Sequence, residues 1–185
     1  MSVARLPAVT LARTVKAWGA TDDDLSRPLP CDRVLPHADL VVHRAVDVAA
    51  PPELVFRWLC QLRAGPYSYD LVDNLGRRSP RRLTPGLDRL VVGQPAMRIF
   101  RITSFERPHH LTCHSRGLLG QVAVTYAVLP GEEGCHLLMR IRWTPPPLPV
   151  PLGLTTRAMA VGDLVMARRQ LLTLKRLAER DAAAP

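Results

Sequence analysis

The chain has 185 residues, of which 47% are hydrophobic and 22% charged, and its formal net charge is +9. These values are typical of one globular domain with a full hydrophobic core, and they exclude an intrinsically disordered chain. No apolar run has the length of a membrane span or of a secretory signal, so we expect a cytoplasmic protein.

Arginine carries nearly all of the positive charge, and its densest group is "RRSPRR", which contains Arg77, Arg78, Arg81 and Arg82. No aromatic-rich strand motif, paired Cys/His spacing or glycine-rich phosphate loop accompanies these arginines. Because charge alone is non-specific, we interpret them as a solvated surface and do not expect nucleic acid as a partner. An anionic membrane surface stays open as a partner.

Residues 1–38 are expected to form an N-terminal arm or helix that packs on the domain. An amphipathic segment around residues 9–18 comes first. The connector that follows, "TDDDLSRPLPCDRVLPHAD", has prolines at positions 28, 30 and 36. These prolines predict that the connector lacks regular structure.

A half-buried strand is predicted at residues 40–50, "LVVHRAVDVAA", where apolar residues alternate with His43 and Asp47. Arg44 falls on the apolar side, and a buried guanidinium needs a partner. We expect an ion pair there, and the alternative is a clamp for an anionic ligand. Residues 50–62, "APPELVFRWLCQL", combine prolines suited to a first helical turn with apolar residues spaced by three and four, which predicts an amphipathic helix.

A polar run, "GPYSYDLVDN", occupies residues 65–74. If Ser68 caps a short helix, Asp70 and Asn74 lie one turn apart on the same face and Asp73 turns towards water. These side chains either hold the polar end of a ligand or bond to the backbone of the next loop, and we favour the structural role. The loop after them is rich in Gly, Pro and Arg.

In four further segments apolar and polar residues alternate, which predicts strands, and turn signals such as "ERPHH" and "PGEEG" separate them. They are "MRIFRITSFE", "HHLTCHSR", "GQVAVTYAVLP" and "CHLLMRIRW", which together span residues 97–143. In the last segment one face carries Leu137, Met139, Ile141 and Trp143. The other face carries His136, Arg140 and Arg142 and is expected to be exposed to solvent.

The strongest helix is predicted at residues 155–182, with Thr155 or Thr156 as N-cap. Asp163 and Gln170 are seven residues apart and therefore lie on the same side. Either could reach a cavity, but an acidic residue early in a helix also complements the helix dipole, and we favour that role for Asp163.

These elements predict an α+β fold in which a curved antiparallel sheet grips a long C-terminal helix, with residues 39–181 as the domain. Such an arrangement commonly leaves an internal cavity between its two layers, and a hollow of this kind is a natural small-molecule site.

The chain resembles the START-like helix-grip superfamily (SRPBCC, the polyketide cyclase/dehydrase and lipid transport group) over roughly residues 40–180. Three segments carry the resemblance: "HRAVDVAAPPELVFRWLCQL", "YSYDLVDNLGRRSPRRLTPGLDRLVVGQ" and "GDLVMARRQLLTLKRLAER". The second and third are similar to a bacterial subgroup whose members mostly have no assigned reaction. The resemblance implies a helix-grip fold with a deep apolar cavity, and it implies no mechanism.

No nucleophile–base pair or metal-ligand cluster can be assembled from the sequence, and no metal or organic cofactor is expected. The cysteines, Cys31, Cys60, Cys113 and Cys135, form no C-x-x-C pair. We expect reduced, buried thiols, although Cys113 and Cys135 both fall in predicted strands and could face one another. His114 and His136 alternate away from the core and are expected to face solvent.

The sequence therefore predicts a carrier or sensor, monomeric or homodimeric, that binds an apolar small molecule such as a lipid or polyketide. The predicted ligand-binding residues are Trp58, Tyr67, Tyr69, Asp70, Asn74, Phe100, Cys113, Met139, Ile141 and Met166. The alternative is a cyclase, aromatase or dehydratase acting on a natural-product intermediate, with Asp70, Tyr69 and Tyr67 as acid/base groups.

Overall fold

A computed structural model describes residues 13–118, 120–147 and 150–184. One sheet runs in the order β1-β2-β7-β6-β5-β4-β3 and is antiparallel except for the β1–β2 pair. Its strands are β1 (Ala17–Trp18), β2 (Leu40–Val48), β3 (Pro95–Ala96), β4 (Phe100–Glu106), β5 (His110–Gly117), β6 (Gly120–Gly131) and β7 (Gly134–Thr144). The helices are α2 (Asp22–Ser26), α3 (Pro30–Val34), α4 (Pro52–Cys60), η1 (Gln61–Arg63), α5 (Asp70–Asp73) and α6 (Leu152–Ala182).

The five long strands coincide with the five segments of period two. β2 runs antiparallel to β7 with Arg44 opposite Met139, so alternate residues of both strands face the same layer. A register shift between Ile102 and Ser104 marks an irregularity where β4 pairs with β5, the kind of feature that bends a sheet. Beyond β4 the sheet ends in the two-residue strand β3 and does not close into a barrel.

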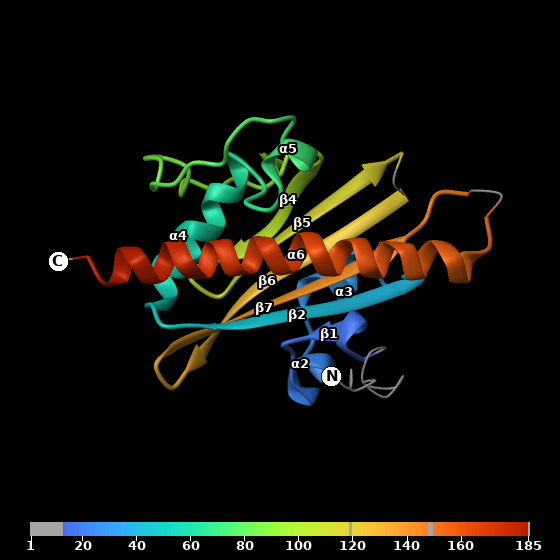
Figure 1. Cartoon of the computed structure of the whole chain (residues 1–185), viewed down its shortest axis with the longest axis horizontal. Helices are drawn as coiled ribbons and strands as arrows, with labels where there is room; N and C mark the ends of the chain where they lie inside the picture. The colour runs from blue at the N-terminus through green and yellow to red at the C-terminus, as the bar shows by residue number, and fades with distance from the viewer. Residues whose placement is uncertain (1–12, 119, 148–149, 185) are drawn as a thin grey trace, which may run out of the picture.

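Helix α6 crosses one face of this sheet, and α4 packs beside it (Figure 1). The main core lies in this layer, where Trp58 of α4 and Leu171 of α6 are fully buried. Trp58 Nε1 also donates a hydrogen bond to Asp181 near the end of α6 at 3.2 Å. The predicted fold class, a curved sheet gripping a long C-terminal helix, is confirmed.

The start of α6 differs from the prediction. The helix begins at Leu152 with Pro151 as N-cap, so neither Thr155 nor Thr156 is the cap. Both threonine hydroxyls donate to the Leu152 carbonyl oxygen at 2.9 Å, inside the first turn. A proline before the first helical residue supplies a fitting φ and needs no donor, which explains how the helix extends back into the proline-rich segment.

The N-terminal segment contains regular structure, and the prediction from its prolines was wrong. Pro30 is the first residue of α3, a position that needs no N–H donor. Thr21 and Asp24 form a reciprocal capping box at the start of α2. Of the predicted amphipathic segment, residues 13–16 are helical, 17–18 form β1, and the earlier residues lie outside the described ranges.

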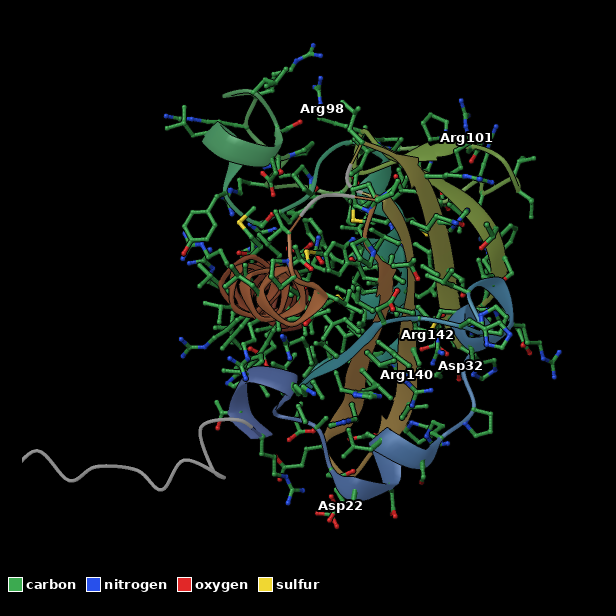
Figure 2. The ribbon with its side chains drawn as sticks, turned by 90° about the vertical axis from the view of Figure 1, so that its right-hand side faces the viewer. Asp22, Asp32, Arg98, Arg101, Arg140 and Arg142 are labelled. Carbon is green, nitrogen blue, oxygen red and sulfur yellow. The ribbon has the colours of Figure 1, made fainter. Side chains whose placement is uncertain are left out.

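Helix α3 packs against β5, β6 and β7 on the outer face of the sheet, opposite α6, and α2 precedes it below the strands of Figure 1 (Figures 1 and 2). A second apolar cluster lies between them and the strands and contains Leu29, Cys31, Leu35, Ala45, Ala123, Ala127 and Leu138. The face of β7 that carries His136, Arg140 and Arg142 was predicted to be exposed to solvent. That prediction was wrong, because the N-terminal segment covers this face.

Arg140 of β7 is the central polar group beneath the N-terminal helices and is buried. Its guanidinium donates to Asp32 Oδ2 at 2.7 Å, to His43 Nε2 at 2.7 Å and to the carbonyl oxygen of Asp24 at 2.8 Å. Arg142, half-buried two residues later, binds the other oxygen of Asp32 at 3.1 Å. Figure 2 shows Asp32, Arg140 and Arg142 together on the side of the sheet away from α6.

The four cysteines are free and buried, as predicted. Cys113 pairs in register with Ile102 and Val124, whereas Cys135 pairs with Val48 and Pro130, so the two strand cysteines do not face one another. In the described part of the chain, no helix combines the length and apolar character that a membrane span requires.

Candidate ligand-binding site

A cavity of about 470 Å³ lies between the sheet and α6. Its walls come from the middle of β6 and β7, one side of α6, the start of β4, and the segments just before β4 and around α5. The lining residues are Pro66, Ser68, Asp73, Met97, Arg98, Ile99, Phe100, Val122, Val124, Tyr126, Met139, Ile141, Met159, Asp163, Met166, Ala167 and Gln170.

Methionine dominates the apolar wall. The chain has five methionines, and the four that follow Met1 (Met97, Met139, Met159 and Met166) all line the cavity. Methionine side chains are unbranched and polarizable, so they adapt to irregular apolar shapes. The wall can therefore accept apolar molecules of more than one shape.

A hydrogen-bonded pair of polar side chains, Tyr126 and Gln170, connects β6 to α6 within this wall. The Tyr126 hydroxyl donates to Gln170 Oε1 at 2.7 Å, and Gln170 Nε2 donates to the Pro66 carbonyl oxygen at 2.6 Å. Complete burial raises the pKa of Tyr126 well above its usual range. With both side chains engaged and the phenol protonated, this pair positions α6 against the sheet and the segment before α5.

Arg44 and Asp163, a lining residue of the cavity, form a buried ion pair, with Arg44 Nη2 2.8 Å from Asp163 Oδ2. The arginine is fully buried and also donates to the carbonyl oxygen of His43 at 2.8 Å. Asp163 Oδ2 has no hydrogen bond of normal geometry among the described residues, so the contact is an ion pair only. Burial raises the pKa of Asp163 to about 6, and the charge of Arg44 opposes that rise.

The expected ion pair of Arg44 is confirmed, and its partner is Asp163. Asp163 is the twelfth residue of α6, far past the first turn, so the favoured dipole role was wrong. A buried arginine on the strand draws the carboxylate inward, which the pattern of α6 alone does not reveal.

Four of the ten predicted ligand-binding residues line the cavity: Phe100, Met139, Ile141 and Met166. Trp58, Tyr67 and Cys113 lie in the core outside the lining, and burial raises the pKa of the Cys113 thiol to about 12. Tyr69 is 43% exposed, and its ring stacks with the Arg169 guanidinium. Binding of a ligand by these ten residues stays a prediction.

The polar run at residues 65–74 is arranged differently from the prediction. Helix α5 starts at Asp70 with Tyr69 as N-cap, and Ser68 instead donates to Asp73. Asp73 and Ser68 line the cavity, so Asp73 does not turn to water. Asp70 accepts bonds from the hydroxyl and the N–H of Ser79 at 2.5 and 2.9 Å. Asp70 therefore holds the next loop, which is the structural alternative of the sequence analysis.

The predicted solvent-facing histidines are partly buried. His136 lies between Asp24 and Asp47, at 3.0 and 2.6 Å, because α2 covers the end of β7. His114 is half-buried, and its Nε2 has no hydrogen-bond partner among the described residues. Within the described ranges, no group of three or more His, Cys, Asp or Glu side chains could hold a metal ion.

Sequence reasoning missed Tyr126 and the segment Met97–Ile99 as parts of the wall. Tyr126 has the same parity as Val122 and Val124 in β6, so the period-two pattern could have placed it on the cavity side. Met97 and Arg98 have left-handed backbone with φ of 43° and 66°, a local bend that no residue type there signals.

No protein-family model and no curated protein matches the chain. Solved structures do match. The di-domain ARO/CYC StfQ from the steffimycin biosynthetic pathway is 16% identical over 79% of this chain and 53% of StfQ, with a TM-score of 0.51. A Rhodobacter sphaeroides protein solved as a structural-genomics target is 20% identical over 80% of this chain and 95% of its own, with a TM-score of 0.50.

At such identities the likeness establishes the fold, and it agrees with the sheet order and the long terminal helix. The chain has the helix-grip fold. This chain spans about half the length of StfQ. In this helix-grip domain the cavity occupies the layer between the grip helix α6 and the sheet.

Two buried groups of the helix-grip domain are expected to give opposite pH dependences of stability. Burial and the Arg140 charge lower the pKa of His43 to about 4, so between pH 4 and 6 only the unfolded chain binds that proton and stability rises with pH. Asp163 has a pKa of about 6 in the folded chain and therefore stays protonated to a higher pH than in the unfolded chain. Between pH 4 and 6 the folded chain binds this proton more strongly, so this group makes stability fall as pH rises. Each effect amounts to about 3 kcal/mol, so they nearly cancel.

Urea denaturation at pH 4 and pH 6 checks this cancellation. From pH 4 to 6 the unfolding free energy of His43→Gln should fall by about 3 kcal/mol relative to wild type, and that of Asp163→Asn should rise by about as much. Parallel pH profiles of the two variants would show that these groups do not oppose each other.

Proposed function

We propose that this helix-grip protein binds or carries an apolar small molecule, such as a lipid or polyketide, in the cavity between α6 and the sheet. The observation that supports this most is the wall itself, in which four methionines with Ile99, Phe100, Val122, Val124 and Ile141 surround a space of about 470 Å³. A space of this size and character suits a small apolar ligand.

A natural-product cyclase, aromatase or dehydratase is the second candidate. The similarity to StfQ favours it, and so does Asp163, a wall carboxyl with a pKa of about 6 that could exchange a proton near neutral pH. Asp70 is less suited to that role because Ser79 occupies both of its oxygens. A dehydratase or aromatase would lower the mass of its bound molecule by one water and a cyclase would convert it to an isomer of the same mass, whereas a carrier would leave it chemically unchanged.

Filling the cavity should weaken binding. Ala167 is a buried wall residue of α6, whereas Val165, two positions earlier, is 51% exposed on the same helix. We expect Ala167→Phe to weaken binding of the neutral apolar dye Nile red by about tenfold or more, and the matched Val165→Phe to leave it unchanged. Fluorescence titration measures the affinity.

Native mass spectrometry of the same proteins gives a second readout. A copurified molecule should accompany wild type and Val165→Phe and be absent from Ala167→Phe. Equal dye affinity and equal bound mass in the two variants would show that the apolar ligand lies elsewhere, and would contradict the proposal.

A further inference from the structure

A second pocket, of about 400 Å³, lies beside the cavity and is lined by arginines. Its ten lining residues are Arg63, Ala64, Gly65, Asn74, Arg77, Arg78, Pro80, Pro95, Ala96 and Arg98. The arginines come from three segments, namely η1, the loop after α5 and the bend before β4. Four arginines from these segments therefore line one concave space, which differs from charges spread over a convex surface.

No acidic residue lines this arginine pocket, and none of its four arginines forms an ion pair within the described ranges. The carboxylates of α5 have other partners, since Asp70 binds Ser79 and Asp73 accepts a bond from Ser68. Like charges held close together without a counter-charge favour binding of an anion.

Hydrogen bonds outside the pocket hold its walls in place. Arg63 Nη1 donates to the carbonyl oxygen of Leu87 at 2.9 Å, while its buried Nε has no partner among the described residues. Asn74 Nδ2 donates to the carbonyl oxygen of Arg77 at 2.5 Å and fixes that loop. Arg63 and the loop that carries Arg77 are therefore positioned before any ligand arrives, which lowers the entropic cost of binding.

Arg98 connects the two hollows, because it lines both the apolar cavity and the arginine pocket. It lies in the left-handed bend with Met97, whose N–H donates to the Leu62 carbonyl oxygen at 2.8 Å. Figure 2 shows Arg98 at the same end of the molecule as α5. Left-handed backbone at a non-glycine residue carries strain, and such residues are concentrated at ligand sites.

We propose that the arginine pocket binds the phosphate group of an amphiphile whose apolar part occupies the cavity. Guanidinium groups bind phosphate through paired, charge-assisted hydrogen bonds, and a dianionic phosphate matches several of them at once. A concave pocket of about 400 Å³ accepts one phosphate-bearing group and not a polymer backbone. This inference rests on the proposed function for the apolar part of the ligand.

Decyl phosphate, with decanol as its uncharged counterpart, tests the proposal through displacement of Nile red. Wild type should bind decyl phosphate about tenfold or more tightly than decanol. That preference should disappear in Arg77→Gln/Arg78→Gln, which changes two exposed residues of the arginine pocket that do not line the apolar cavity and should leave the affinity for Nile red unchanged. The matched variant Arg157→Gln/Arg176→Gln removes two exposed charges from α6 and should keep the preference.

Inorganic phosphate distinguishes an amphiphile from the free anion. The proposal expects inorganic phosphate to bind far more weakly than decyl phosphate, whereas equal affinity would assign the pocket to free phosphate and overturn the link to the cavity. Equal loss of preference in both double variants would reduce the effect to net charge and also overturn it. If wild type does not bind Nile red at all, that result would instead count against the proposed function. Because the substituted arginines are exposed, all variants are expected to fold, and Arg78→Gln alone serves as a milder second test.

Discussion

Replacing Arg44 by methionine is expected to lower the free energy of unfolding by about 3 to 5 kcal/mol at pH 8. The guanidinium is fully buried and is the ion-pair partner of Asp163, 2.8 Å away. Methionine fills a similar volume, so the loss comes mainly from a buried carboxylate left without its counter-charge. Urea denaturation measures the effect, and Arg176→Met, an exposed control on α6, should change stability by less than about 0.5 kcal/mol.

The loss should shrink as pH falls. The pKa of Asp163 is already raised to about 6, and without Arg44 it rises further, so the carboxyl becomes neutral and the uncompensated charge disappears. We expect the cost of Arg44→Met at pH 5 to be smaller than at pH 8. In Arg44→Met/Asp163→Leu most of the lost stability should return. A cost that is independent of pH and persists in the double variant would assign the effect to packing.

The sheet and the grip helix could be predicted because their patterns are local. Strands β2, β4, β5, β6 and β7 each alternate over seven or more residues, and α6 has an apolar stripe without an internal proline. Apolar patterns of that length with a period of 2 or of 3.6 residues distinguish strands from helices clearly. The same patterns correctly placed Phe100, Met139, Ile141 and Met166 in the layer that contains the cavity.

The rest of the site depends on contacts between distant segments, which no local pattern encodes. Asp70 and Asp73 belong to the same short helix. The sequence left open whether Asp70 holds a ligand or the next loop, with the structural role favoured, and it turned Asp73 towards water. Ser79, nine residues after Asp70, binds both of its oxygens, and Asp73 lines the cavity instead. The arginine pocket likewise forms only when three separated segments meet.

The outer face of the sheet illustrates the same limit. The alternation in β7 correctly places Met139 and Arg140 on opposite faces of the sheet. It does not show whether the face that carries Arg140 is exposed to water or covered by another element. In β2, His43 and Arg44 lie on opposite faces in the same way, with His43 opposite Arg140 and Arg44 opposite Met139. The Arg44 side chain donates to the carbonyl oxygen of His43, so the two polar networks meet at one strand.

Arg140→Met is expected to lower the free energy of unfolding by about 3 kcal/mol and to loosen helices α2 and α3. The guanidinium binds Asp32, His43 and the carbonyl oxygens of Asp24 and Leu25, and each loses a charged donor. Asp32 is 29% exposed and keeps its contact with Arg142, so the cost should not exceed that of removing Arg44.

Cys31 provides a direct measure of this loosening. It is fully buried in α3, and its N–H donates to the Thr125 hydroxyl at 3.0 Å beneath the helix. If Arg140 anchors the N-terminal helices, Arg140→Met should speed modification of Cys31 by a thiol reagent about 100-fold. The three cysteines at other sites, Cys60, Cys113 and Cys135, serve as internal controls.

Two further variants separate the contributions at this anchor. Arg142→Met removes the half-buried neighbour and should accelerate modification of Cys31 much less, because its own contacts are with the carbonyl oxygens of Leu35 and Pro36 and with Asp32. Arg140→Lys keeps the charge without the planar fork and should be intermediate. If Cys31 reacts no faster than Cys60 in Arg140→Met, the apolar contacts of Leu29 and Leu35 alone hold the helices on the sheet.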